Sequence, residues 1–233
     1  MTIMKLFRSL AVVAAVTSRC WAADACPSTE GANAHPTFDA ALLKEGRFTY
    51  HTTLGGKSLG DTVIEIRRVG ATYRITMSAA DIAQSWEATV KPSFGPLTAH
   101  LKMRARGVPY EMSLRYDGTR ITGEESKEGV TTPVSATSTG VVIDQRVDWA
   151  SMMAIEAGAG SSMTMSVYDP STGFSPMLGK VGTAAGMVRF DYSICKREHV
   201  ENYTVFATAT TPRHMLREDM PNGLVSELIR VEP

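Results

Sequence analysis

The stretch LTAHLKMRARGVPYEMSLRYDG, residues 97–118, contains two runs in which apolar and polar residues alternate. In the first run, Leu97, Ala99, Leu101, Met103 and Ala105 alternate with Thr98, His100, Lys102, Arg104 and Arg106. In the second, Tyr110, Met112, Leu114 and Tyr116 alternate with Glu111, Ser113 and Arg115. Successive side chains of a strand point to opposite faces, so this period predicts two strands with one buried face and one solvated face. Such one-sided burial is typical of an antiparallel sheet.

The same period occurs in other parts of the chain. Tyr73, Ile75, Met77 and Ala79 form one apolar series, and Val188, Phe190, Tyr192 and Ile194 form another. Asp117-Gly118 is a strong two-residue hairpin signal, while Gly55-Gly56 and Glu128-Gly129 are weaker connectors. The sequence therefore predicts an all-β, mainly antiparallel fold: a curved meander sheet or half-barrel of about ten to twelve strands.

One segment departs from this period. The stretch VDWASMMAIEAG, residues 147–158, has apolar residues at helical spacing. Asp144 or Asp148 is suited to cap its start, and Gly158 and Gly160 follow its end. We expect a helix of about ten residues there. Its apolar stripe is too small to be stable alone, so we expect this single short central helix to pack on the concave side of the sheet.

The first residues resemble a secretory signal. Lys5 and Arg8 precede an uncharged apolar run, residues 10–16, and small residues follow it. The run is too short to span a bilayer, which favours a removable signal peptide over residues 1–22, with cleavage after Ala22 or after Ala25. A lipoprotein anchor is disfavoured, because neither nearby cysteine follows a lipobox-like run. We expect an irregular N-terminal arm over residues 23–43 and a single antiparallel β domain over residues 44–233.

The charge balance limits the classes of partner. Removing residues 1–22 leaves 21 basic against 24 acidic residues, a net charge of −3. The sequence also has no block of like charge. It therefore lacks the basic patch typical of a nucleic-acid-binding protein and the polybasic segment typical of a membrane-binding one. No second apolar run reaches membrane-spanning length, so we expect a protein that does not span the membrane after signal removal. The predicted location is the periplasm, with secretion beyond the cell as the alternative.

Cysteine usage agrees with export. The chain has three cysteines, and Cys20 leaves with the signal. Two thiols in an oxidising compartment most simply form one disulfide, which predicts a Cys26–Cys195 bond. Cys195 falls on the polar side of its strand, so this bond would hold the arm across the outside of the sheet. A metal pair or a catalytic thiol has no support from spacing.

No motif selects a catalytic, cofactor-binding or metal-ligating residue. The five histidines lack metal-ligand spacing, and there is no nucleophile elbow, phosphate loop or dinucleotide fingerprint. The adjacent Glu124 and Glu125 would point to opposite faces of a strand, which argues against joint acid–base work. Copper ligation by Met163 and Met165 has no nearby histidine to support it. We therefore predict a non-enzymatic protein without a cofactor or metal.

Methionine is the more informative residue type. Met fills irregular gaps in cores and also makes adaptable surfaces for apolar ligands. Because several methionines fall on predicted dry faces, the candidate ligand-lining residues are Trp149, Met152, Met153, Met103 and Met112. The alternative is that these side chains fill an ordinary core and plug the concavity of the sheet, and we favour that alternative.

The order of these features is similar to that of a known family. The segments are GRFTYHTTLGGKSLGDTVIEI (46–66), ATYRITMSA (71–79), PSFGPLTAHLKMRARGVPYEMSLRYDG (92–118), VDWASMMAI (147–155) and GLVSELIRV (223–231). They resemble the bacterial exported proteins grouped as domain of unknown function 3108, over most of residues 44–231. The resemblance implies a curved antiparallel half-barrel, similar in outline to periplasmic lipoprotein carriers. It implies no activity and no catalytic residue, and the arm and the disulfide are additions to its pattern.

Three hypotheses of function follow. The first is an exported, periplasmic, non-enzymatic protein of the cell envelope that binds an apolar ligand such as a lipid or a lipoprotein acyl chain. The second is a structural or protein-interaction module that docks an envelope protein and has no ligand cavity. The third is a hydrolase whose site the sequence does not display.

Overall fold

The computed structural model describes residues 26–28, 30–105, 107–197 and 199–233. Its strands are β1 (Gly46–Leu54), β2 (Lys57–Val69), β3 (Thr72–Ala79), β4 (Gln84–Val90), β5 (Pro96–Ala105), β6 (Val108–Asp117), β7 (Arg120–Lys127), β8 (Val130–Thr137), β9 (Val142–Asp144), β10 (Ser162–Asp169), β11 (Gly173–Ala184), β12 (Met187–Cys195), β13 (Val200–Ala207), β14 (Met215–Met220) and β15 (Leu224–Glu232). The α-helix is α1 (Asp148–Met153), and the 3₁₀ helices are η1 (Ala40–Leu42), η2 (Ala80–Ile82), η3 (Gln145–Val147) and η4 (Pro221–Gly223). The predicted signal peptide lies outside the described residues.

All fifteen strands belong to one sheet, in the order β8-β7-β6-β5-β4-β3-β2-β1-β15-β14-β13-β12-β11-β10-β9. Neighbours are antiparallel except for β9 and β10, which run parallel. The all-β, mostly antiparallel prediction is confirmed, but the expected ten to twelve strands are too few. The pattern underestimates the count because some strands lack clean alternation: β8 (VTTPVSAT) is largely exposed, and β11 (GFSPMLGKVGTA) is interrupted by Gly and Pro.

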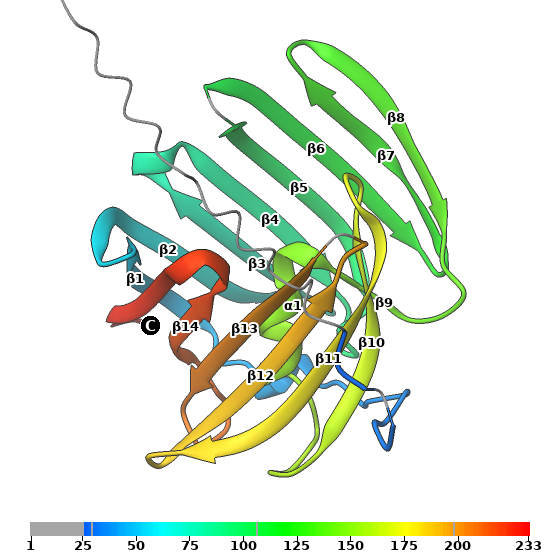
Figure 1. The fold of residues 1–233 in the computed structure, drawn as a ribbon. Helices are drawn as coiled ribbons and strands as arrows, with labels where there is room; N and C mark the ends of the chain where they lie inside the picture. The colour runs from blue at the N-terminus through cyan, green and yellow to red at the C-terminus, as the bar shows by residue number, and fades with distance from the viewer. Residues whose placement is uncertain (1–25, 29, 106, 198) are drawn as a thin grey trace, which may run out of the picture.

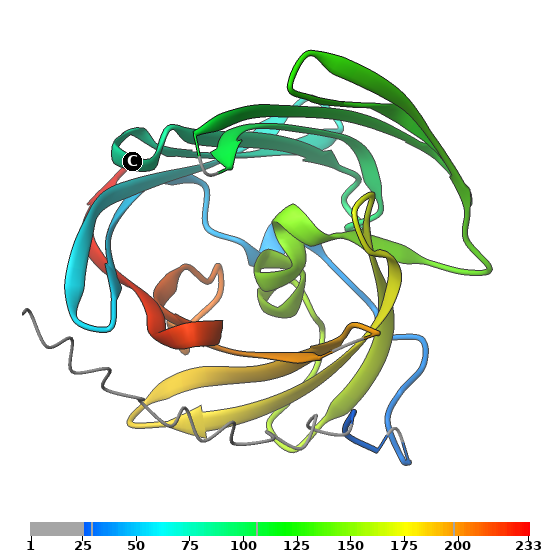
Figure 2. The same ribbon diagram turned by 45° about the horizontal axis from the view of Figure 1, so that its top comes forward.

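The sheet curls into a deep half-barrel around α1, which lies inside the curve (Figure 1, Figure 2). Irregular registers in β1, β13 and the β4–β5 pair introduce bulges that strengthen the local twist. Asp117 pairs directly with Arg120, so the hairpin turn falls on Gly118 and Thr119, one residue later than the signal predicts. The predicted short helix on the concave side is present.

The predicted dry faces are the faces that point inward. Ile75, Ala99 and Phe190 are fully buried, and Met112 and Leu114 are nearly so. Polar residues of the same strands, such as His100, are exposed. Alternation along single strands thus identified the concave surface correctly, because a solvated outer face and a dry inner face impose this period on an antiparallel sheet.

The central helix is shorter than predicted. α1 has six residues and is preceded by η3, whose start is capped by Asp144 accepting from the Arg146 backbone N–H at 2.9 Å. The carbonyls at the end of the helix have partners elsewhere in the chain: Arg213 donates to the Met153 carbonyl at 2.8 Å, and the Asp39 N–H of the N-terminal arm donates to the Ala154 carbonyl at 2.8 Å. The helix ends before Gly158 and Gly160, the glycines expected to follow it.

A glycine on β11 lets the helix approach the sheet. A Cβ added at Gly179 would lie 2.6 Å from the Met152 Cε, closer than real contacts allow. Met152 and Met153 have no exposed surface. These two side chains fill the space between helix and sheet.

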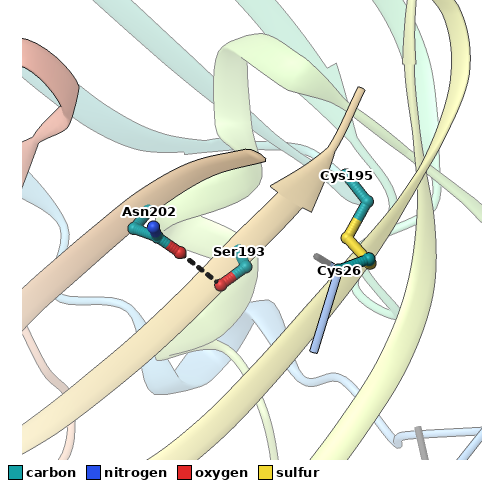
Figure 3. Close-up of a disulfide and its surroundings, with 4 residues drawn as sticks. All are labelled: Cys26, Ser193, Cys195 and Asn202. Carbon is teal, nitrogen blue, oxygen red and sulfur yellow. Dashed lines mark hydrogen bonds between the residues drawn. A yellow bond between two sulfur atoms is a disulfide. The ribbon is translucent and has the colours of Figure 1, made fainter. Parts of the chain in front are cut away.

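The N-terminal arm is attached to the sheet by a disulfide and by backbone pairing. Cys26 is bonded to Cys195 at the end of β12, as predicted, with a Cα–Cα distance of 5.7 Å (Figure 3). Further on, the Asn33 N–H donates to the Ser162 carbonyl at 2.8 Å, which adds the arm to β10. Pro27, Ser28, Glu30 and Ala32 lie beside polar residues of β12 and β13, including Ser193 and Asn202, so this part of the arm lies on the outer face. Within the described chain, no helix is long and apolar enough to cross a bilayer.

Candidate functional site

A cavity of about 420 Å³ lies between the concave face of the sheet and the η3–α1 segment. This volume falls in the range of about 300–1,000 Å³ typical of small-molecule sites. Its apolar lining residues come from opposite ends of the chain: Tyr50, Leu59, Ile64, Met77, Ala79, Ile82, Trp86, Leu101, Trp149, Tyr203, Met215, Met220 and Leu224. The curl of the sheet brings them together, since β1 pairs with both β2 and β15.

The candidate lining residues divide into two groups. Trp149 lines this cavity. Met152, Met153 and Met112 lie in the packed core, and Met103 is half-buried and packs against that core; none of these four lines the cavity. The helix therefore has two sides, a methionine side that plugs the concavity and a tryptophan side that forms one wall of the remaining space.

A buried ion pair closes the sheet beside this cavity. The Arg146 guanidinium donates from Nε and Nη2 to the two oxygens of Asp144 at 2.5 and 2.7 Å, and from Nη1 to Asp169 Oδ2 at 2.6 Å. Tyr116 on β6 donates its hydroxyl to Asp144, which lies at the end of β9. Side chains thus join the β9 end of the sheet to β6, although these strands are not hydrogen-bonded neighbours. The β7–β8 hairpin extends beyond this seam (Figure 2).

Arg146, Asp144 and Asp169 form this seam, and their charged groups bond mainly to one another. Arg146 has only 6 % of its side chain exposed, and Asp144 has none. Burial alone would raise the pKa of the Asp169 carboxyl, but Arg146 and the hydrogen bonds from Ser171 outweigh it and lower that pKa. Since three of the five guanidinium N–H groups already donate to carboxylates, little donor capacity remains for a ligand.

A second polar group in the cavity wall consists of two carboxyls that share one hydroxyl. The Tyr192 hydroxyl lies 3.3 Å from Glu218 Oε1 and 3.5 Å from Asp148 Oδ1. Both acids are buried, with 8 % and 5 % of their surface exposed. Burial, opposed in part by the Tyr192 hydrogen bond, raises the pKa of Glu218 to about 7. Burial and then the charge of Glu218 raise the pKa of Asp148.

Neighbouring aromatic and hydroxyl groups complete the polar part of the wall. The Tyr203 ring stacks on Tyr192 with centroids 4.7 Å apart, and the Tyr50 hydroxyl donates to the Met215 carbonyl at 3.1 Å. Burial and the charge of Glu218 raise the pKa of Tyr50. Thr52 contacts Ser226 at 3.0 Å through hydroxyl groups. The cavity therefore has an apolar body and one acidic region.

Other candidates from the sequence are not brought together. His100 is exposed and contacts Ser113 at 3.0 Å, and Glu125 accepts from Tyr110 at 3.1 Å. Ser193 donates to Asn202 at 2.7 Å (Figure 3). Among the described residues, no three His, Cys, Asp or Glu side chains gather as a metal site.

Sequence reasoning missed the acidic region. Asp148 was considered only as a helix cap, and Glu218 carried no spacing signal, because it is separated from Asp148 by 70 positions in the chain and the two meet only after the sheet curls. A polar residue on the apolar side of β14 is the one local sign: Glu218 and Met220 share the side that faces the cavity.

These observations define a class: a curled antiparallel half-barrel that holds a helix inside and keeps a ligand-sized cavity beside it. The chain belongs to the protein family of unknown function DUF3108, whose model matches residues 43–185. The matched range includes α1 and Arg146 but ends before β12 and β14, which supply Tyr192 and Glu218. No curated protein matches the chain. No solved structure matches it either.

Proposed function

We propose that this protein is an exported, non-enzymatic protein of the bacterial cell envelope that holds the alkyl chain of a lipid or other amphiphile in the cavity beside α1. The observation that carries the proposal is the cavity itself, because most of its lining is apolar and it includes Trp86 and Trp149. Burying an alkyl chain against such a wall gains roughly 0.8 kcal/mol for each CH₂ group.

Two features support export and a periplasmic location. The Cys26–Cys195 disulfide is a bond that persists in oxidising compartments. Residues 1–22 carry the charge-then-apolar order of a secretory signal. Cell fractionation and N-terminal sequencing test this part of the proposal. We expect a mature protein in the periplasmic fraction that begins at Ala23 or Cys26; a cytosolic chain that retains Met1 would contradict it.

The ligand is tested by native mass spectrometry of the purified protein and by calorimetric titration with decanol. We expect one molecule bound per chain. The blocking variant is Ala79→Phe, which fills the cavity from β3; its matched control is Ser78→Phe, on the adjacent exposed position of the same strand. Binding should be lost in the first variant and kept in the second. A protein that carries no lipid and does not bind decanol would refute the proposal.

A further inference from the structure

When its two carboxyls are ionised, the acidic region of the cavity has more hydrogen-bond acceptors than donors. Asp148 accepts the adjacent Trp149 backbone N–H on Oδ1 at 2.6 Å. Tyr192 has a single O–H, which can serve either Asp148 or Glu218 but not both at once. Within the described chain, the hydrogen bonds to these acids end on Asp148 Oδ1 and Glu218 Oε1. The second oxygen of each carboxyl is therefore unpartnered, and both side chains line the cavity.

These free acceptors are open to the cavity. The second oxygens of Asp148 and Glu218 are not among the side-chain atoms that are fully buried without a partner, so a ligand in the cavity can reach them. Polar groups inside proteins are normally hydrogen-bonded. Asp148 and Glu218 are at least nine-tenths buried. The hydroxyl pair Thr52–Ser226 and the Tyr50 hydroxyl already have partners of their own. A ligand that brings hydrogen-bond donors would satisfy the two carboxyls together.

The charges nearby favour a cation over an anion as that donor. Arg146 is the one described guanidinium that lines the cavity, and Asp144 and Asp169 together more than neutralise it. An anionic head group would meet two further carboxyls and a guanidinium with little remaining donor capacity. A primary ammonium group supplies three N–H donors and a positive charge, which matches two carboxylates.

We propose that the cavity binds an amphiphile with a primary ammonium head group, which sits between Asp148 and Glu218 while its alkyl chain lies against Trp86 and Trp149. This inference rests on the proposed function, since it names the chemistry of the ligand held in the same cavity. It also assigns these two acids as the residues that set head-group specificity.

Proton exchange accompanies this binding. In the free protein, burial favours protonated carboxyls, and an ammonium ion stabilises the ionised form instead. The titratable groups that face Glu218 are Asp148, Tyr192, Tyr50 and Tyr203, from α1, β12, β1 and β13, and the neighbouring Asp219 on its own strand. Tyrosines do not titrate near neutrality, so the carboxyls release the proton.

The experiment compares decylamine, decanol and decanoate, which share one alkyl chain, by calorimetric titration of the purified full-length protein. We expect decylamine to bind about tenfold to a hundredfold more tightly than decanol, as for a hydrogen bond between charged groups, and decanoate to bind most weakly. Glu218→Gln and Asp148→Asn should each remove most of the preference for decylamine and leave decanol binding unchanged. The matched control is Glu227→Gln, which changes an exposed carboxylate on β15. This variant should keep the wild-type preference for decylamine over decanol.

A second measurement needs no variant. The affinity of the wild-type protein for decylamine should rise between pH 6 and pH 8 as the carboxyl proton leaves, since the pKa of Glu218 is about 7 and an alkylamine keeps its proton throughout. Decanol affinity should stay constant over this range. Equal affinity for decylamine and decanol, tighter binding of decanoate, or pH-independent decylamine binding would overturn the head-group inference alone. Failure of all three probes to bind would overturn the proposed function as well.

Discussion

Replacing Arg146 with methionine should destabilise the protein far more than replacing an equally paired arginine on the surface. Arg146 bridges Asp144 and Asp169 through bonds of 2.5–2.7 Å, and its side chain is 6 % exposed. Arg217 bridges Asp219 and Glu227 at 2.6 and 2.7 Å, but its side chain is 43 % exposed. The two sites have the same ionic composition, so they differ mainly in solvation.

The expected magnitude follows from what each truncation leaves behind. Without Arg146, the fully buried Asp144 loses its cationic partner and keeps only the Tyr116 hydroxyl and the backbone N–H of residue 146, and breaking a buried pair in this way typically costs about 3–5 kcal/mol. Asp169 adds little to this, because 20 % of its side chain is exposed and can be hydrated. The loss is a large fraction of a total stability of about 5–15 kcal/mol. At Arg217 the same truncation leaves two carboxylates that water already solvates, so it should lower the free energy of unfolding by at most about 1 kcal/mol.

Urea unfolding followed by circular dichroism measures both changes. The double variant Arg146→Met with Asp144→Asn should recover about half or more of the loss, since it removes the unpaired charge and retains a side-chain oxygen to cap η3. Equal losses of unfolding free energy at Arg146 and Arg217, or no recovery in the double variant, would refute the reasoning that burial is what makes the loss of Arg146 costly.

Three further outcomes are expected. Glu218→Gln should gain stability relative to the wild type as pH rises from about 4.5 to 7, because the raised pKa of Glu218 in the folded protein makes its ionisation destabilising; the gain should approach about 3 kcal/mol and then level off. Gly123→Ala should cost about 1–3 kcal/mol in urea unfolding, since its Cβ would lie 2.0 Å from a β6 carbonyl oxygen, whereas Gly182→Ala in an open position of β11 should cost less. Replacing Cys26 and Cys195 together by serine should lower the free energy of unfolding by up to about 5 kcal/mol in the chain-entropy model, and free thiols in a non-reducing peptide map of the wild type would contradict the bond itself.

The secondary structure was predictable where solvation is one-sided. Four strands have one buried face and one solvated face: β3, β5, β6 and β12. Their apolar and polar residues therefore alternate along the sequence with a period of two. β8 is largely exposed, and β11, although one of its faces is buried, has Gly and Pro within its sequence, so neither strand shows clean alternation and the strand count was underestimated for that reason. The Cys26–Cys195 bond followed from the cysteine count, without geometry.

The site depended on tertiary structure. Local periodicity identified a helix with Trp149 on it, but not which side of that helix faces the core and which faces a cavity. That division depends on Gly179, which admits Met152, and on the arm, which binds the Ala154 carbonyl just after the helix. The acidic region requires Asp148 and Glu218 to meet across a curled sheet. The sequence by itself determined alternation, turns and the disulfide, because these arise from neighbouring residues and residue types; only the folded chain decided the cavity, because its walls come from strands whose spacing in sequence bears no relation to their distance in space.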